Sequence, residues 1–130
     1  MNREETLVSR KEQGPDAELH PALKLRLARE RIFFGPGPAE LLTQIRQTDS
    51  VRMACEQMGI SYSKGWKMIN TIEEELGYQV TKRQQGGRNG GSASLTPEGE
   101  TLLAKYQELE RRSQEAVGRI FDELFGPLDL

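Results

Sequence analysis

A three-residue turn between two amphipathic segments is the feature that most constrains how this chain can fold. The turn is residues 59–61 (Gly-Ile-Ser), and the segment before it, residues 51–59, places small and apolar side chains on one face after the N-cap residue Ser50. The segment after it, residues 62–77, follows a second N-cap residue, Ser61, and ends at a glycine. So short a turn forces the two helices to cross sharply, which is the geometry of a helix-turn-helix.

The second of these helices has one apolar side, centred near Ile69 and Leu76, and one polar side. Its ammonium, hydroxyl and amide groups can reach phosphates and base edges in the major groove of DNA, and its N-terminus can attract a phosphate. Three carboxylates at residues 73–75 restrict such contacts to the opening turns. A solvated surface helix is the alternative interpretation. The candidate DNA-binding residues on the polar side are Ser63, Lys64, Lys67, Asn70 and Thr71.

Two short strand patterns, residues 78–84 and 92–96, flank a glycine-rich stretch that cannot pack into a core. We expect a hairpin whose tip carries positive charge, and such a loop can follow the DNA backbone or enter the minor groove. The alternative is a flexible linker with incidental charges. The candidate DNA-binding residues of this hairpin are Lys82, Arg83, Arg88 and Asn89, and its tip glycines are Gly86, Gly87, Gly90 and Gly91.

The N-terminal part of the chain divides into an arm, a hairpin and a helix. Residues 1–20 are polar and aperiodic, which predicts a mobile arm. Alternating leucines at 23–27 and the apolar run 32–34 predict two strands of a hairpin. The sequence GPGP at 35–38 ends the hairpin, and the helix expected next covers residues 39–47.

From Pro97 the pattern predicts one long amphipathic helix, closed by a glycine and a proline at 126–127. Its apolar residues recur at alternating spacings of four and three, as in a seam between two helices. Packing on its own domain is a plausible alternative for the first half, whereas too little chain remains to cover the second half. The candidate dimer-interface residues are Leu102, Tyr106, Leu109, Ala116, Ile120, Phe121 and Leu124.

Composition narrows the function classes. The 130 residues predict one domain, and the net charge of −2 conceals positive charge concentrated at residues 21–35 and 61–96. The sequence has no signal peptide and no apolar run long enough to span a membrane, so we expect a cytoplasmic protein. One cysteine and one histidine exclude an intrachain disulfide and a protein-only zinc site. We find no catalytic arrangement and expect no enzyme, no metal and no cofactor.

Several motifs together resemble the N-terminal DNA-binding domain of molybdate-responsive ModE-type regulators, a winged helix-turn-helix related to that of LysR-type regulators. They are GISYSKGW at 59–66, GGRNGGSASLTPEG at 86–99 and ETLLAKY at 100–106. The likeness covers about residues 22–110, including KLRLARERIFFGPGPAELL at 24–42 as hairpin and first helix. It implies an α+β, mainly helical fold with an N-terminal β-hairpin and a long C-terminal dimerisation helix.

The resemblance also implies roles for particular residues. Ser61 and Tyr62 join the polar side of the recognition helix at its groove-facing start, and residues 86–91 form the wing tip. Full-length ModE regulators sense molybdate through additional C-terminal domains, and because this chain ends at Leu130 we do not expect it to bind molybdate directly. Gly65 stands where an alanine is common, and because glycine costs up to about 1 kcal/mol in a helix interior, we expect a looser recognition helix.

These inferences together predict a homodimeric, sequence-specific double-stranded DNA-binding transcriptional regulator, with a possible link to molybdate homeostasis. The expected organisation is a mobile arm at 1–20, a winged helix-turn-helix with N-terminal hairpin at 21–96 and a dimerisation helix at 97–126. Two-fold symmetry predicts a pseudo-palindromic DNA site. The alternative is a winged-helix interaction module that dimerises with another regulator without binding DNA, which the low net charge and the glutamate triplet favour.

Overall fold

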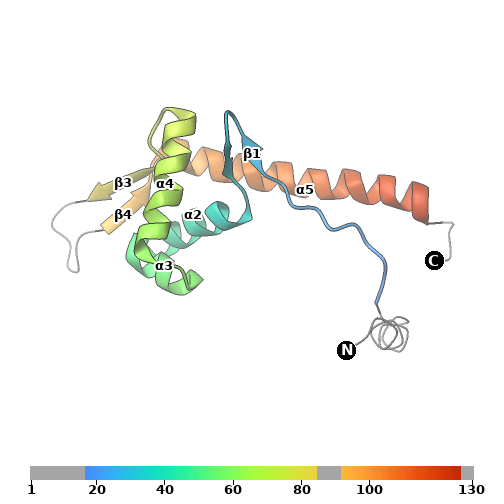
Figure 1. The fold of residues 1–130 in the computed structure, drawn as a ribbon, viewed down its shortest axis with the longest axis horizontal. Helices are drawn as coiled ribbons and strands as arrows, with labels where there is room; N and C mark the ends of the chain where they lie inside the picture. Colours follow the sequence, from blue (N-terminus) through green and yellow to red (C-terminus); the bar gives the residue numbers. More distant parts are fainter. Residues whose placement is uncertain (1–16, 85–91, 127–130) are drawn as a thin grey trace. The chain divides into compact units, whose positions relative to one another are not determined.

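The computed structural model describes residues 17–84 and 92–126, and the predicted α+β, mainly helical fold is confirmed (Figure 1). Lys24–Ser113 form one compact unit, and the described residues before and after them belong to a second. Two antiparallel hairpins, β1–β2 and β3–β4, accompany the helices. The elements, labelled as in Figure 1, are β1 (Leu27–Ala28), β2 (Ile32–Phe34), α2 (Pro36–Thr48), α3 (Val51–Met58), α4 (Tyr62–Leu76), β3 (Thr81–Gln84), β4 (Ser92–Leu95) and α5 (Pro97–Phe125).

The core of the Lys24–Ser113 unit lies where α2, α3 and α4 meet. The apolar face predicted for the first helix is buried, and the apolar sides of α3 and α4 pack against it. Ser50 Oγ accepts a hydrogen bond from the Met53 N–H at 3.0 Å, which confirms the predicted N-cap of α3. The fully buried residues include Leu41, Leu42, Ile45, Ala54, Ile69, Ile72, Val80 and Leu103.

The N-terminal hairpin is shorter than the leucine alternation predicts. Leu23 is 40% exposed, and the first strand contains only two residues, Leu27 paired with Phe34 and Ala28 with Ile32. In an antiparallel ladder, residues before Leu27 would have to pair beyond Phe34, where α2 already begins. Pro36 therefore explains why the hairpin is shorter than predicted, because proline has no N–H to donate to a ladder and suits the first turn of a helix. For the same reason α2 begins at Pro36 and not at Ala39.

A compact junction connects β3, β4 and α5. The Thr96 hydroxyl accepts a hydrogen bond from the Gly99 N–H at 2.9 Å, which caps α5, and donates to the Gln79 carbonyl at 2.7 Å. A Cβ on Gly99 would collide with the carbonyl oxygen of Val80, so glycine is required where the helix passes this backbone. The long helix predicted from Pro97 is confirmed. No helix within the described ranges is both long enough and apolar enough to cross a membrane.

Candidate nucleic-acid interface

The turn between α3 and α4 is fixed by backbone and side-chain hydrogen bonds at both ends. Gly59 has a φ of 70°, a left-handed conformation that glycine adopts without side-chain strain. The next N–H, of Ile60, donates to the last turn of α3 at 3.0 Å. On the other side of the turn, Ser61 Oγ accepts from the Lys64 N–H at 3.1 Å. The predicted end of α3 and the predicted N-cap of α4 are therefore confirmed.

The close crossing of α3 and α4 depends on Gly65. This residue is buried, and a Cβ attached to it would collide with the Sγ atom of Cys55. The structure thus gives Gly65 a packing role in place of the loosening expected from the sequence. Burial raises the pKa of the Cys55 thiol more than its contact with the Gly65 backbone lowers it. Cys55 is 2% exposed, as predicted for a small core residue.

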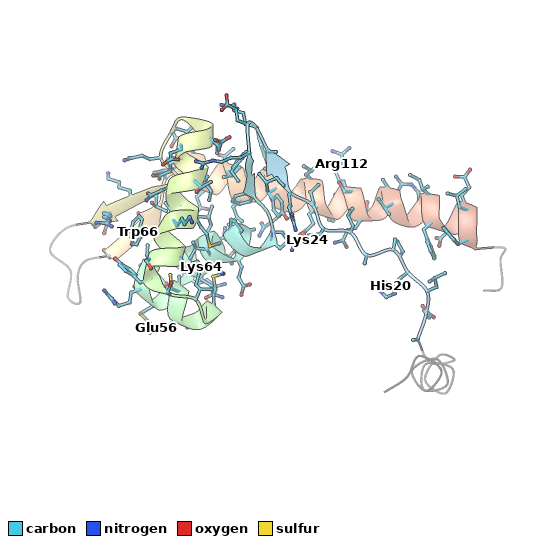
Figure 2. All side chains as sticks on the ribbon, in the orientation of Figure 1. His20, Lys24, Glu56, Lys64, Trp66 and Arg112 are labelled. Atoms are coloured by element: carbon cyan, nitrogen blue, oxygen red, sulfur yellow. The ribbon has the colours of Figure 1, made fainter. Side chains whose placement is uncertain are left out.

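The opening turns of α4 present most of the predicted DNA-binding residues to solvent, and Figure 2 shows Lys64 among them. Lys64 and Lys67 are exposed, and neither forms an ion pair with a residue in the described ranges. Thr71 is half-buried, and its hydroxyl donates to the Lys67 carbonyl at 2.9 Å. Ser61 lies at the N-terminal end of this surface. We call this surface the polar face of α4, and it consists of Ser63, Lys64, Lys67, Asn70 and Thr71.

Arginine–aromatic contacts lie beside the polar face and connect three elements. Arg52 of α3 lies over the ring of Tyr62, 4.5 Å from its centroid, and Tyr62 meets Trp66 edge to face. Arg83 of β3 lies over the other aromatic ring, 4.1 Å from the centroid of Trp66. Trp66, predicted as a core residue, is half-buried and packs against the core. Stacking of this kind holds both guanidinium groups against α4 while their N–H groups remain able to donate.

The second hairpin brings two of its predicted basic residues next to α4. Its register runs from Thr81 opposite Leu95 to Gln84 opposite Ser92, and the exposed Lys82 and Arg83 lie between. The contact of Arg83 with Trp66 shows that β3 and α4 are adjacent. The other predicted residues of this hairpin lie outside the described residues, namely Arg88, Asn89, Gly86, Gly87, Gly90 and Gly91.

The three carboxylates at the end of α4 are engaged within the unit. Glu73 Oε2 accepts from the Val80 N–H at 2.8 Å and more weakly from the next N–H at 3.3 Å. Glu74 and Glu75 both bind the guanidinium of Arg31, in the turn of the first hairpin. This triplet is one of the features that favour the interaction-module alternative, and its contacts give the three carboxylates a structural role within the unit.

Glu75 is the most firmly held of the three carboxylates. Its Oε1 accepts from the backbone N–H groups of Glu30 and Arg31 at 3.0 and 3.3 Å, and its carbonyl accepts from Arg29 at 2.9 Å. Partial burial raises the pKa of this carboxyl, but the two backbone hydrogen bonds and the Arg31 charge outweigh it and hold the pKa below its ordinary value. The end of α4 is therefore a docking point for the first hairpin.

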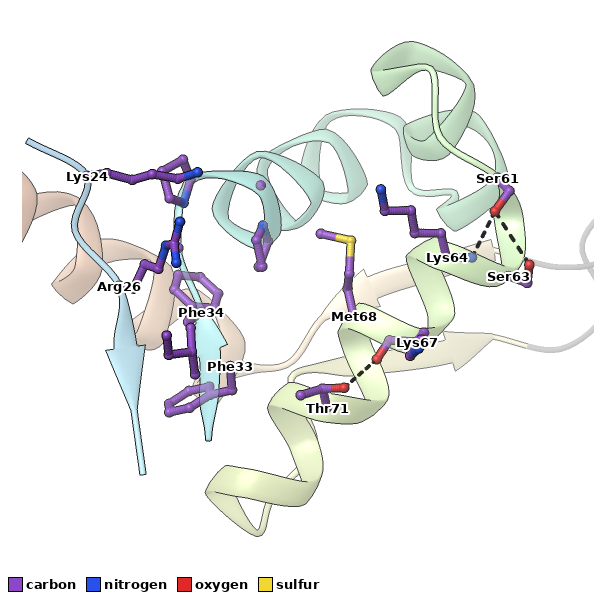
Figure 3. A pocket seen from close by; sticks show the side chains of 15 residues that line it. Lys24, Arg26, Phe33, Phe34, Ser61, Ser63, Lys64, Lys67, Met68 and Thr71 are labelled. Carbon is purple, nitrogen blue, oxygen red and sulfur yellow. Dashed lines mark hydrogen bonds between the residues drawn. The ribbon is translucent and has the colours of Figure 1, made fainter. Parts of the chain in front are cut away.

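A groove with a volume of about 780 Å³ lies between the first hairpin and the start of α4 (Figure 3). Lys24 and Arg26 line one side of it, and Lys64 and Lys67 line the other. Its apolar lining comes from residues 32–38 and from Met68. We call it the cationic groove, and neither Lys24 nor Arg26 is among the site residues predicted from the sequence.

Comparison with known proteins shows which families this part of the chain resembles. Residues 39–100 match the bacterial regulatory helix-turn-helix proteins of the lysR family. The transcriptional regulator ModE of Yersinia pestis is 37% identical over 116 residues, which cover 87% of this chain and 41% of that protein. Residues 39–100 are therefore similar in sequence to a LysR-type helix-turn-helix domain.

Two further relationships are more distant. The DNA-binding transcriptional dual regulator ModE of Escherichia coli (strain K12) is 31% identical over 113 residues, which are 87% of this chain and 42% of that protein. The chain thus spans less than half the length of these two ModE relatives. The crystal structure of the BenM DBD–benA site 1 DNA complex has 21% identity and a TM-score of 0.48, covering 65% of this chain and 92% of that one.

The predicted dimer-interface residues on α5 fall into two groups, one before and one after the end of the Lys24–Ser113 unit. In the Lys24–Ser113 unit, Tyr106 is 2% exposed, donates its hydroxyl to the Leu25 carbonyl at 2.8 Å and meets Phe34 edge to face. Tyr106 is therefore not available to a partner, and its assignment to the dimer interface is wrong. Leu102 is half-buried against the same core, whereas Leu109 is 44% exposed.

Beyond Ser113 the apolar stripe of α5 is more open. Ile120 and Leu124 are 53% and 61% exposed, and Phe121 stacks on Phe125 with ring centroids 5.1 Å apart. Ala116 and Phe121 are half-buried in the described part of the chain. The exposed members of this stripe remain candidates for contact with a second copy.

Three basic residues near the polar face were not predicted as site residues from the sequence: Lys24, Arg26 and Arg52. Arg52 lies on a different helix from the Tyr62 ring that it covers, so no periodicity within one segment reveals the contact. For Lys24 and Arg26 a signal existed, because residues 21–35 form a basic stretch in the sequence. The composition of that stretch did not reveal which of its cations line the groove and which bind the carboxylates of α4.

Proposed function

We propose that this chain binds double-stranded DNA sequence-specifically as a homodimer and regulates transcription. In this proposal the start of α4 enters the major groove, and β3 with its hairpin lies against the flanking backbone. The observation that carries the proposal is the exposed pair Lys64 and Lys67, free of ion pairs within the described chain, at the start of the second helix of a LysR-type helix-turn-helix.

Each residue type of the polar face has a part in this proposal. Lys64 and Lys67 bind phosphates or the acceptor edge of guanine, and Asn70 bonds adenine on two atoms. Ser61 and Ser63, with the free N–H groups of the first turn of α4, bind a phosphate of the backbone. Tyr62 supports Arg52, and Trp66 supports Arg83, so that both guanidinium groups face the duplex. Lys82, Arg88 and Asn89 contact the backbone from the second hairpin.

The homodimer is proposed from the exposed apolar stripe of α5. Leu109, Ile120 and Leu124 expose large side chains that a second copy of the helix would cover. A two-fold dimer places its two recognition helices about 34 Å apart, or a multiple of that spacing, and so selects a pseudo-palindromic site. The proposal requires no catalytic residue, no metal and no cofactor, and it places the chain in the cytoplasm with the DNA.

We infer a link to molybdate homeostasis from the ModE relatives alone. The proposed link concerns which genes the chain controls, and it does not require these 130 residues to bind the oxyanion. Selecting bound sequences from a random duplex library and locating them upstream of genes would test this part separately from DNA binding.

The test of DNA binding measures the affinity of the full chain for a selected duplex by fluorescence anisotropy at several salt concentrations. Lys64→Ala and Lys67→Ala are expected to weaken binding, and each reduces the slope of log affinity against log salt by about 0.9 if it removes one phosphate contact. Lys105→Ala, which removes an exposed cation of α5 outside the cationic groove, is the matched control and leaves the slope unchanged. Unchanged affinity and slope in both α4 variants would contradict the proposed interface.

A further inference from the structure

The basic stretch at residues 24–31 divides its charges between two tasks. Arg29 and Arg31 bind the end of α4 through Glu74 and Glu75. The remaining two cations, Lys24 and Arg26, line the cationic groove and form no ion pair within the described residues. The arginines in the turn of the hairpin thus anchor it to α4, whereas the two cations just before β1 have no carboxylate partner in the described chain.

The lining of the cationic groove is suited to a negatively charged chain that also has apolar surface. Four cations line it, Lys24 and Arg26 from the segment just before β1 and Lys64 and Lys67 from α4, and no carboxylate is found among its described lining residues. Aromatic and proline side chains of residues 33–38 complete the lining, and Met68 lies between the two pairs of cations. The backbone of DNA has this character, because phosphates alternate with deoxyribose rings that offer apolar contact.

The groove is continuous with the polar face of α4. Lys64, Lys67 and Thr71 belong to both surfaces (Figure 3). A DNA strand that contacts the start of α4 could therefore continue along the groove toward Lys24 and Arg26. Gly35 is buried beside Arg26, and even a methyl group there would press on Arg26 Cγ at 3.3 Å. The absence of a side chain at residue 35 therefore leaves room for the arginine stem at the edge of the groove.

We propose that Lys24 and Arg26 bind the phosphates next to the stretch of duplex contacted by α4, so that the segment leading into the first hairpin extends the DNA footprint. The inference rests on the proposed DNA-binding function. These contacts involve the backbone only, so they raise affinity for all sequences alike and leave base preference to α4.

The experiment compares the full chain with the variant Lys24→Gln/Arg26→Gln on a random-sequence duplex across a salt series. Glutamine keeps the methylene stem near Gly35 and removes the charge. Loss of two phosphate contacts is expected to lower the magnitude of the salt slope by about 1.8 and to weaken binding equally for selected and random duplexes. Lys24→Arg/Arg26→Lys keeps both charges and retains the slope, and Lys105→Gln serves as the control outside the groove.

Hydroxyl-radical footprinting on the selected duplex locates the effect. The glutamine variant is expected to lose protection at the nucleotides flanking the α4 contact while the inner protection remains. Wild-type binding with an unchanged slope and footprint in the glutamine variant would overturn this inference and leave the proposed function intact. Failure of the wild-type chain to bind any duplex would overturn both, and loss of base preference in the variant would reassign the two residues to base contacts.

Discussion

The two ends of α4 differ in how their charges are used. At its start, Lys64 and Lys67 are exposed and lack a carboxylate partner in the described chain. At its end, Glu73 binds backbone N–H groups, and Glu74 and Glu75 bind Arg31. One helix therefore presents free cations at one end and internally bound carboxylates at the other.

This difference shows why the net charge of −2 says little about a polyanionic partner. At the end of α4, Arg31 offsets one of the three carboxylate charges, and the contacts within the unit hold all three carboxylates away from the start of the helix. The free lysines keep their full field. A duplex approaching the start of α4 would meet positive charge, although the helix as a whole carries more acidic than basic residues.

The largest stability effect is expected at Glu73. Alanine at this position leaves the buried N–H groups of Val80 and Thr81 without their acceptor, at a cost of about 3 kcal/mol in the free energy of unfolding. Urea denaturation of the wild-type chain and of Glu73→Ala measures this cost. A loss of that size would establish that the end of α4 is a structural anchor.

The neighbouring carboxylate supplies the matched control. Glu74 is 66% exposed and pairs with an exposed arginine, so Glu74→Ala is expected to cost below about 1 kcal/mol. Equal costs for Glu73→Ala and Glu74→Ala would contradict the distinction between a backbone-binding and a surface carboxylate within the triplet.

The start of α4 is expected to be sensitive to the size of residue 65. On an exposed helix, replacing glycine by alanine stabilises by up to about 1 kcal/mol. Here the added Cβ meets Cys55 Sγ, so Gly65→Ala is expected to cost about 2 kcal/mol in the free energy of unfolding.

A double-mutant cycle tests whether Cys55 is the cause. In the Cys55→Ala background the space of the thiol is empty, so the same glycine-to-alanine change is expected to cost less there or to stabilise. Thermal and urea denaturation of the four proteins measure the coupling. An identical cost in both backgrounds would mean that another contact limits residue 65.

Elements and caps were predictable because their signals are local. Ser50 and Ser61 cap helices through N–H groups three residues away, and Gly59 and Gly77 end helices through their own backbone conformation. Such interactions lie within one turn of the chain, so sequence alone specifies them. The face of α4 was predictable in the same way, since its period follows from helix geometry.

Contacts between distant segments were not predictable in this way. Arg31 and Glu75 are 44 residues apart, and nothing in either segment indicates that they meet. The apolar stripe of α5 likewise did not show that Tyr106 would be covered by the first hairpin through Leu25 and Phe34. An apolar side chain fits an intramolecular core and a dimer seam equally well, so only the fold decides between them.

The smallest expected effect is a pH dependence at Glu75. Because hydrogen bonds and the Arg31 charge hold its pKa below the ordinary value of about 4.3, the folded chain favours the ionised carboxylate. Its contribution to stability is therefore present above about pH 4.3 and is lost as the pH falls through the lowered pKa of the folded state. The difference in melting temperature between the wild-type chain and Glu75→Gln should shrink from about pH 7 to about pH 3.

The variant Glu108→Gln is the control that distinguishes the effect of Glu75 from a general loss of stability in acid. Its pKa is also lowered, chiefly by the hydrogen bond from Arg111, but the pair is exposed within the single helix α5. Solvent screening makes such pairs weak, so Glu108→Gln is expected to change the pH profile less than Glu75→Gln does. Equal changes in the two profiles would mean that the Glu75 contacts hold the hairpin no more firmly than an ordinary surface ion pair, and the anchored end of α4 would lose its distinction from the free one.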